Sequence, residues 1–101
     1  MATNPQKKAV IRIVKAVCYD MGVPVCSVFG PRRHDKVAWA RMTAIYLVQC
    51  RTSITPPQIA SIFHRCEGVI HYAARKAQER YCIDKEYAAQ VSKLLKTCLL
   101  P

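Results

Sequence analysis

Apolar residues recur at helical spacing along most of the chain. Between residues 8 and 21 they follow one another at three- and four-residue steps, at Val10, Ile13, Val14, Val17 and Met21. This period is typical of a helix with one buried face. Gly22 and Pro24 should end it, because glycine accepts the left-handed conformation of a helix end and proline cannot continue a helix. A short helical turn over residues 25–29 is expected next.

The segment from Lys36 to about Gln49 is apolar nearly all round, which predicts a helix in the centre of the molecule. Arg41 is the only charged residue in its interior. An unpaired buried guanidinium would be strongly destabilising. The side chain of Arg41 must therefore reach the edge of the protein or find a partner.

Clear start signals mark the next helix. Thr55 is suited to the N-cap, Pro56 to the first helical position, and Gln58 to the return hydrogen bond of a capping box. A short helix from Pro56 to Phe63 is predicted. After a turn of about four residues, a second helix is predicted over residues 67–81.

The last helical segment follows Asp84, which is suited to cap it. Its apolar face is formed by Tyr87, Val91, Leu94, Leu95 and Cys98. No alternation of polar and apolar residues persists long enough to predict a strand. A chain of this length is expected to form one core. The predicted fold is therefore a single all-α domain over residues 1–101, a bundle of five or six helices.

Charge is the strongest signal in the composition. The chain has 16 Lys and Arg against 6 Asp and Glu, a formal net charge of +10 and a pI near 9.7. A field of this sign attracts polyanions, so nucleic acid is the leading partner. No apolar run approaches the length of a membrane span, and the six cysteines have no secretory leader before them. We expect a cytoplasmic protein whose cysteines are reduced and act as small core residues.

Four residues with metal-binding or nucleophilic side chains lie close together in sequence: His64, Cys66, Glu67 and His71. No further metal ligand follows at a recognisable spacing, and no orienting carboxylate supports a Cys-His nucleophile. We expect an exposed polar turn here, with no metal, no cofactor and no enzymatic activity. Core or partly buried positions are expected for three aromatic residues, Trp39, Tyr46 and Tyr72.

A short capped helix, a tight turn and a second helix on a basic domain form the plan of a helix-turn-helix, whose second helix enters the major groove of DNA. With this plan, the sequence resembles the C-terminal DNA-binding domain of the bacterial chromosomal replication initiator DnaA. The matching motifs are Arg32-Arg33 in a basic loop, Ala40-Arg41 and Tyr46-Leu47 in the long helix, and Thr55-Pro56-Pro57-Gln58-Ile59 through Phe63. The resemblance implies a Trp-repressor-like fold and a place in the bacterial nucleoid. The initiator's ATPase is not expected, because no GxxxxGK[ST] motif is present and the domain would stand alone.

The resemblance also implies roles for single residues. Arg33 would reach into the minor groove, and Arg41 would lie near phosphates. The chain departs from the family where Asp, His and Thr read bases, since Cys66, Glu67 and Gly68 stand there. Glu67 is suited either to accept a hydrogen bond from a cytosine amino group or to cap the helix. The family's usual DNA sequence is therefore not assumed as the target.

We expect sequence-specific binding to double-stranded DNA, in transcription or replication control, by a monomer or weak dimer with a possible protein partner. The helix over residues 67–81 would enter the major groove. The residues predicted to contact DNA are Arg32, Arg33, His34, Arg41, Arg51, Thr55, Arg65, Cys66, Glu67, Gly68, Val69, His71, Arg75 and Lys76. The alternative is a protein-interaction module that kept the fold and lost base-specific reading.

Overall fold

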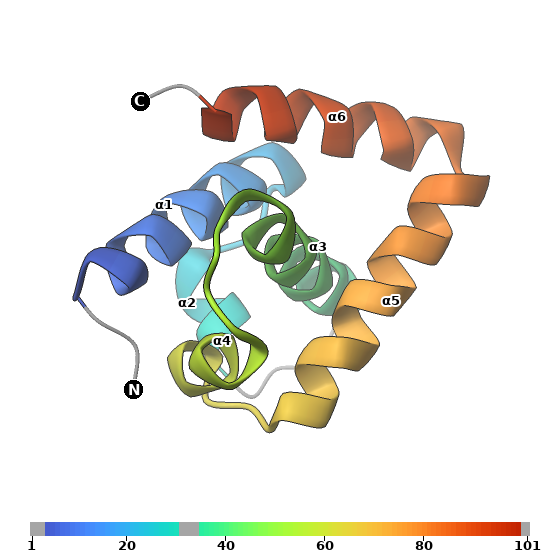
Figure 1. Ribbon diagram of the computed structural model, residues 1–101. Helices are drawn as coiled ribbons and strands as arrows, with labels where there is room; N and C mark the ends of the chain where they lie inside the picture. Colours follow the sequence, from blue (N-terminus) through green and yellow to red (C-terminus); the bar gives the residue numbers. More distant parts are fainter. Residues whose placement is uncertain (1–3, 31–34, 100–101) are drawn as a thin grey trace.

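Six helices account for nearly all of the described chain (Figure 1). The computed structural model describes residues 4–30 and 35–99. The helices are α1 (Asn4–Met21), α2 (Val25–Phe29), α3 (Asp35–Arg51), α4 (Pro56–Phe63), α5 (Glu67–Ile83) and α6 (Lys85–Leu99). No strand occurs among the described residues. The prediction of an all-α domain with five or six helices is confirmed, and the described residues form six.

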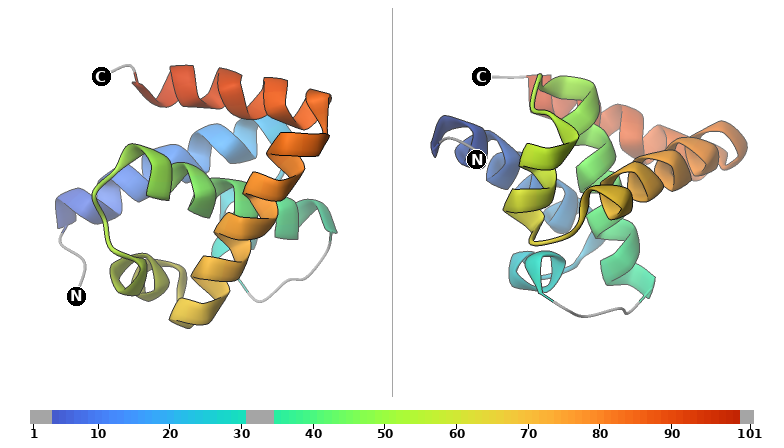
Figure 2. Two further views of the ribbon diagram at one scale, coloured as in Figure 1. Left: turned by 45° about the vertical axis from the view of Figure 1, so that its right-hand side comes forward. Right: turned by 60° about the horizontal axis from the view of Figure 1, so that its bottom comes forward.

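Helix α3 runs through the middle of the molecule and contacts all five other helices. In Figure 1, α1 lies on one side of it and α5 on the other, α6 lies above and α4 below, and Figure 2 shows the same arrangement from two further directions. The buried side chains of α3 include Val37, Ala40, Ala44, Ile45, Leu47 and Val48. Their spread around the helix explains why this segment is apolar nearly all round, and it confirms the predicted central position.

The amphipathic pattern of α1 is confirmed by burial. Its core residues are Val10, Ile13, Val14 and Val17. The helix begins at Asn4, before the apolar pattern starts, because Pro5 is tolerated in a first helical turn and that turn needs no buried face. Gly22 ends the helix with a φ of +69°, the left-handed conformation expected of it.

The start of α6 is fixed by Asp84, as the sequence predicts. Its Oδ1 accepts hydrogen bonds from the backbone N–H groups of Glu86 (3.0 Å) and Tyr87 (3.1 Å). The bond from Tyr87, ahead of the contribution of Arg80, lowers the pKa of the Asp84 carboxyl below its ordinary value. On the face of α6 that meets the core, Tyr87, Val91 and Leu94 are buried. The side chain of Cys98 lies outside the described residues.

The cysteines do not form part of the core to the extent expected. Among the described cysteines, which are all free, only Cys18 is buried. Those at positions 26, 50, 66 and 82 are exposed. Each of the exposed ones lies on the outward face or at the end of a helix, so the prediction that the cysteines serve as core residues is wrong for them. Residue type alone does not decide burial when the helix face points outward.

Candidate nucleic-acid interface

Helices α4 and α5 are joined by a turn of three residues whose geometry is set by hydrogen bonds. Thr55 donates its backbone N–H to Oε1 of Gln58 at 3.1 Å, which is the return bond predicted at the start of α4. At the other end, Arg65 N–H donates to Ala60 O at 3.0 Å and His64 N–H to Ser61 O at 3.4 Å. This pair of bonds is the Schellman arrangement. It requires a left-handed residue, and His64 takes that conformation with a φ of +55°.

The sequence pattern does not mark His64 as the residue that ends α4. Glycine usually occupies such a position, because a Cβ in the left-handed region is strained. The interpretation of His64 as part of an exposed polar turn agrees with its exposure. Its backbone, rather than its imidazole, shapes the turn.

Helix α5 begins with Glu67, and its first turn is open to solvent. The carboxylate Oε1 of Glu67 lies 3.3 Å from Nε2 of His71, with both side chains more than half exposed. This contact between residues four apart accounts for the pair without a metal ion. Among the described residues, no group of three or more His, Cys, Asp or Glu side chains is arranged to hold a metal.

One face of α5 is buried and the other is exposed. Ile70, Ala73 and Ala77 pack into the core. The exposed face carries Gly68, Val69, His71, Tyr72 and Arg75, with Lys76 partly exposed beside them. A Cβ built on Gly68 would have no atom within 4 Å. The first three turns of α5 therefore present an open surface, and five of the residues predicted to contact DNA lie together on it: Gly68, Val69, His71, Arg75 and Lys76.

Tyr72 is a member of this surface that the sequence reasoning missed. It was expected in or near the core, but its side chain is 50% exposed. The Arg75 guanidinium lies 5.8 Å and the Lys76 ammonium 5.7 Å from the centre of its ring. Trp39 and Tyr46, expected to be core or partly buried, are partly buried. The spacing of Tyr72 from Ile70 and Ala73, which are buried against the core, places it on the opposite face of the helix.

Arg41 has a different role from the one expected. Its side chain is 9% exposed, and it is directed at the end of α2. Nε donates to Val28 O at 2.8 Å, while Nη2 donates to Gly30 O at 3.0 Å and to Ser27 O at 3.3 Å. The predicted phosphate contact is therefore corrected: the guanidinium is used to satisfy carbonyl groups at a helix C-terminus, which lack intrahelical donors. Burial, and to a smaller extent the charge of Arg65, lower the pKa of Arg41.

Arg65 joins the turn before α5 to the end of α2. Its Nη2 donates to Gly30 O at 2.6 Å, and its Nη1 donates to His64 O at 3.3 Å. Gly30 O thus accepts from two arginines. Gly30 is the last described residue before the basic segment that contains Arg32, Arg33 and His34, which lie outside the described residues. The contact places Gly30 beside the turn that precedes α5.

The remaining predicted residues are not gathered on the surface of α5. Arg51 is exposed at the last residue of α3, and Thr55 is exposed at the N-cap of α4. Cys66 is exposed at the N-cap of α5 and makes no side-chain cap bond.

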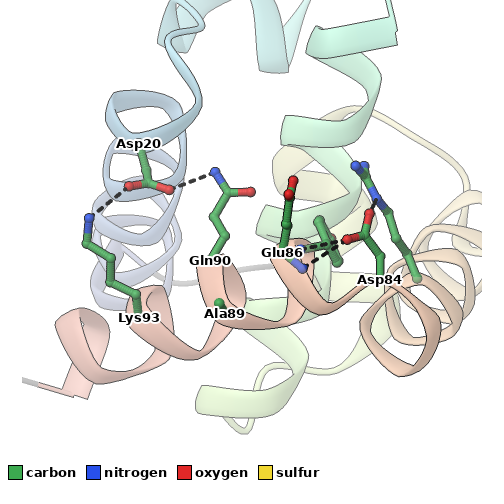
Figure 3. A pocket seen from close by; sticks show the side chains of 8 residues that line it. Asp20, Asp84, Glu86, Ala89, Gln90 and Lys93 are labelled. Atoms are coloured by element: carbon green, nitrogen blue, oxygen red, sulfur yellow. Dashed lines mark hydrogen bonds and ion pairs between the residues drawn. The ribbon is translucent and has the colours of Figure 1, made fainter.

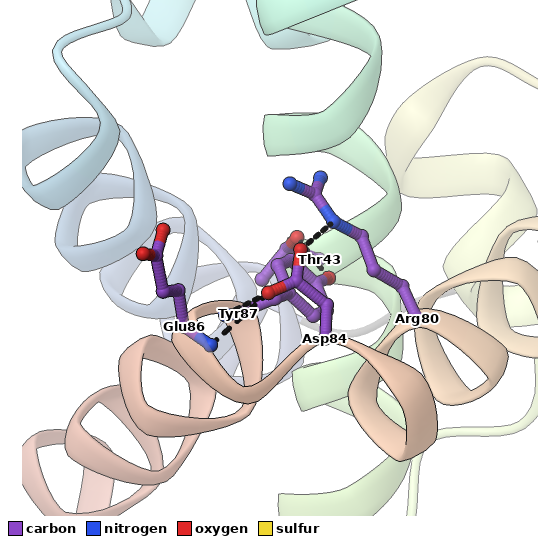
Figure 4. A network of polar contacts seen from close by, with 5 residues as sticks. All are labelled: Thr43, Arg80, Asp84, Glu86 and Tyr87. Atoms are coloured by element: carbon purple, nitrogen blue, oxygen red, sulfur yellow. Dashed lines mark hydrogen bonds and ion pairs between the residues drawn. The ribbon is translucent and has the colours of Figure 1, made fainter.

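The C-terminal half of α5 is anchored rather than open. The Arg80 guanidinium lies 4.4 Å from the ring centre of Trp39 on α3 and 4.5 Å from that of Tyr87 on α6. Its Nε donates to Oδ2 of Asp84 at 3.3 Å (Figure 4). The hydroxyls of Thr43 and Tyr87 share a buried hydrogen bond of 2.5 Å in the same network. One arginine therefore holds three helices together.

Acidic side chains gather at this anchored end. A hollow of about 460 Å³ is lined by three acidic side chains, Asp20, Asp84 and Glu86, and by two basic ones, Arg80 and Lys93 (Figure 3). Asp20 accepts from Gln90 at 2.8 Å and from Lys93 at 3.4 Å. Half of the six acidic residues of the chain lie there. Of the other acidic residues, Glu67 begins α5 and Glu79 lies in its C-terminal half, where its carboxylate is 3.8 Å from the Lys76 ammonium.

The two helices, their turn and the exposed face define a helix-turn-helix domain. The family model described as "Bacterial dnaA protein helix-turn-helix" matches residues 10–77, and the chain belongs to this family. A crystal structure described as that of a DNA replication initiation factor has the same fold, with a TM-score of 0.82 and 23% sequence identity over 92% of the chain. The chain corresponds to 29% of the length of that protein. A comparison with curated proteins found no match. No helix of the described residues has the length and apolarity to cross a membrane.

Proposed function

We propose that this domain binds a specific sequence of double-stranded DNA, with the first turns of α5 in the major groove, and that it acts in transcription or replication control by binding rather than catalysis. The observation that carries the proposal is the exposed N-terminal face of α5. This face carries Arg75 and Lys76 and does not line the hollow that contains Asp20, Asp84 and Glu86. It follows a turn whose conformation is fixed by backbone hydrogen bonds. A helix presented in this way can lie in a groove about 12 Å wide.

A second contact is proposed for the basic segment. Arg32 and Arg33 would enter the adjacent minor groove, as the resemblance to the family implies. The Arg65 contact supports this, because it places Gly30 next to the turn that precedes α5. Arg33→Ala should weaken the best site and relax its preference at an A·T-rich flank, since narrow A·T-rich minor grooves attract arginine.

The proposal is tested by selecting bound duplexes from a random pool and measuring affinity for the best one as salt is raised. Between 50 and 200 mM salt, six to ten phosphate contacts should lower the affinity by about 10³–10⁵. The Arg75→Ala, Lys76→Ala double variant should reduce the salt slope by about 2. The Lys85→Ala, Lys96→Ala double variant, which removes the same two charges from exposed positions of α6, should leave the slope unchanged.

A flat response to salt would contradict DNA binding. It would favour the alternative, a protein-interaction module that kept the fold without reading bases. Binding that is salt-dependent but equal for selected and random duplexes would contradict sequence specificity alone.

A further inference from the structure

We propose that Tyr72 is a specificity-determining residue of the DNA-binding surface, and that its ring reads the C5-methyl group of a thymine in the major groove. This inference rests on the DNA binding proposed above. The family's base-reading positions, which are replaced here, lie at the start of α5. The inference assigns the reading of a base to Tyr72, which lies one turn further along the helix.

Tyr72 has the largest side chain on the exposed face near the start of α5. Gly68, Tyr72 and Arg75 are four and three residues apart, so they are neighbours on one face of the helix. Gly68 has no side chain, and no protein atom lies within 4 Å of the place where its Cβ would be. The space over Gly68, on the N-terminal side of the ring, is therefore open to an incoming DNA edge.

The two cations next to Tyr72 indicate the direction in which the ring faces. Arg75 and Lys76 lie 5.8 and 5.7 Å from the ring centre. Because they are consecutive residues, they leave the helix on different sides of the line through Tyr72. A helix in the major groove has phosphates along both sides and base edges below it. When Arg75 turns to one phosphate, and Lys76 leaves its 3.8 Å contact with the Glu79 carboxylate for another, the ring between them is left facing the bases.

The chemistry of the ring then selects the base. Half of the Tyr72 side chain is exposed, and most of its surface is apolar. In the major groove, thymine alone among the four bases presents an apolar group, its C5-methyl. Contact between the ring and this methyl group removes apolar surface from water on both sides.

The test replaces each thymine of the selected duplex in turn by deoxyuridine, which removes only the methyl group. The wild-type protein should lose about fourfold in affinity at one position, the amount that corresponds to burying one methyl group. Tyr72→Ala should bind the thymine and deoxyuridine duplexes equally at that position, whereas Tyr72→Phe, which keeps the ring, should still distinguish them. Tyr19→Ala removes a 92% exposed tyrosine from α1 and should change nothing.

Three results would overturn the inference: no position sensitive to deoxyuridine, unchanged discrimination by Tyr72→Ala, or lost discrimination by Tyr72→Phe. Thermal melting shows whether each variant is folded, and Tyr72→Gln provides a second ring-free variant if Tyr72→Ala is not. Failure of the proposed function is seen differently, as the absence of salt-dependent binding to any duplex.

Discussion

Each half of α5 places an arginine next to an aromatic ring, but one of these contacts is exposed and the other joins neighbouring helices. At the end of the N-terminal half, Arg75 lies 5.8 Å from the centre of the Tyr72 ring, and both side chains are exposed. Near the C-terminus, Arg80 lies within 4.5 Å of the ring centres of Trp39 and Tyr87, between α3 and α6. The first pair is available to a ligand, and the second ties three helices together. An arginine next to an aromatic residue therefore does not by itself indicate a DNA contact, because the neighbouring helices decide what the pair can reach.

Arg41 extends this comparison to the centre of the molecule and carries the largest expected effect. Arg41→Met should lower the free energy of unfolding by about 3 kcal/mol, because buried carbonyl groups would lose charged donors. Urea denaturation measures the change. Arg51→Met alters an exposed arginine of the same helix and should change stability by less than about 0.5 kcal/mol. Equal effects of the two variants would contradict the structural role of Arg41.

Arg80→Ala tests the anchored half of α5 directly. The free energy of unfolding should fall by about 1–2 kcal/mol, the size of partly desolvated cation–π contacts. DNA affinity of the folded variant should stay near that of the wild type. Arg75→Ala is the matched variant in the open half, and it should show the reverse result, with weaker DNA binding and nearly unchanged stability. Loss of stability in both variants would remove the distinction between the two halves.

The turn that separates α4 from the open half of α5 is expected to be strained at one residue. His64→Gly should raise the free energy of unfolding by about 1 kcal/mol, because glycine adopts the left-handed conformation without a clash of its Cβ. Thermal melting of the variant and of Ser61→Gly provides the comparison. Ser61 lies within α4, where glycine should lower stability by about 0.5–1 kcal/mol. A less stable His64→Gly variant would indicate that the imidazole itself makes stabilising contacts.

The smallest expected effect is the pH dependence of the anchored end. The folded state lowers the pKa of Asp84, mainly through the hydrogen bond from the Tyr87 N–H. A lowered folded-state pKa contributes stability that is present above the ordinary carboxyl pKa of about 3.9 and is lost as the pH falls through the folded value. Asp84→Asn should therefore be less stable than the wild type at neutral pH, and the difference should shrink on acidification. A constant difference in melting temperature from pH 6 to pH 2 would contradict this origin.

Local signals were sufficient to place the helices. Thr55 and Gln58 mark the start of α4, Gly22 the end of α1, and Asp84 the start of α6, and each is confirmed by its hydrogen bonds or its φ angle. Each of these signals involves residues only a few positions apart, so the sequence alone is sufficient to locate these helix ends. The turn at His64 is the exception, since histidine adopts the left-handed conformation more often than most residues but far less readily than glycine.

The candidate site was predicted in part. The position of the helix that follows the turn, and the group of Gly68, Val69, His71, Arg75 and Lys76 on its exposed face, follow from spacing and charge. The roles of Arg41 and Tyr72 do not. For Arg41, the partners come from α2, more than ten residues earlier in the chain. For Tyr72, the residue type favours burial as much as exposure, and the side that α3 covers had to be known.

The sequence by itself thus determined the helical class of the protein, the ends of its helices, its basic charge and its family resemblance, because each of these depends on composition or on contacts within a few residues. Only the tertiary structure decided which arginines hold the framework and which face outward, and which aromatic residue lies on the exposed surface. These properties depend on contacts between segments distant in sequence. The packing of α5 against α3 leaves Tyr72 in solvent, while the packing of α6 against both encloses Arg80.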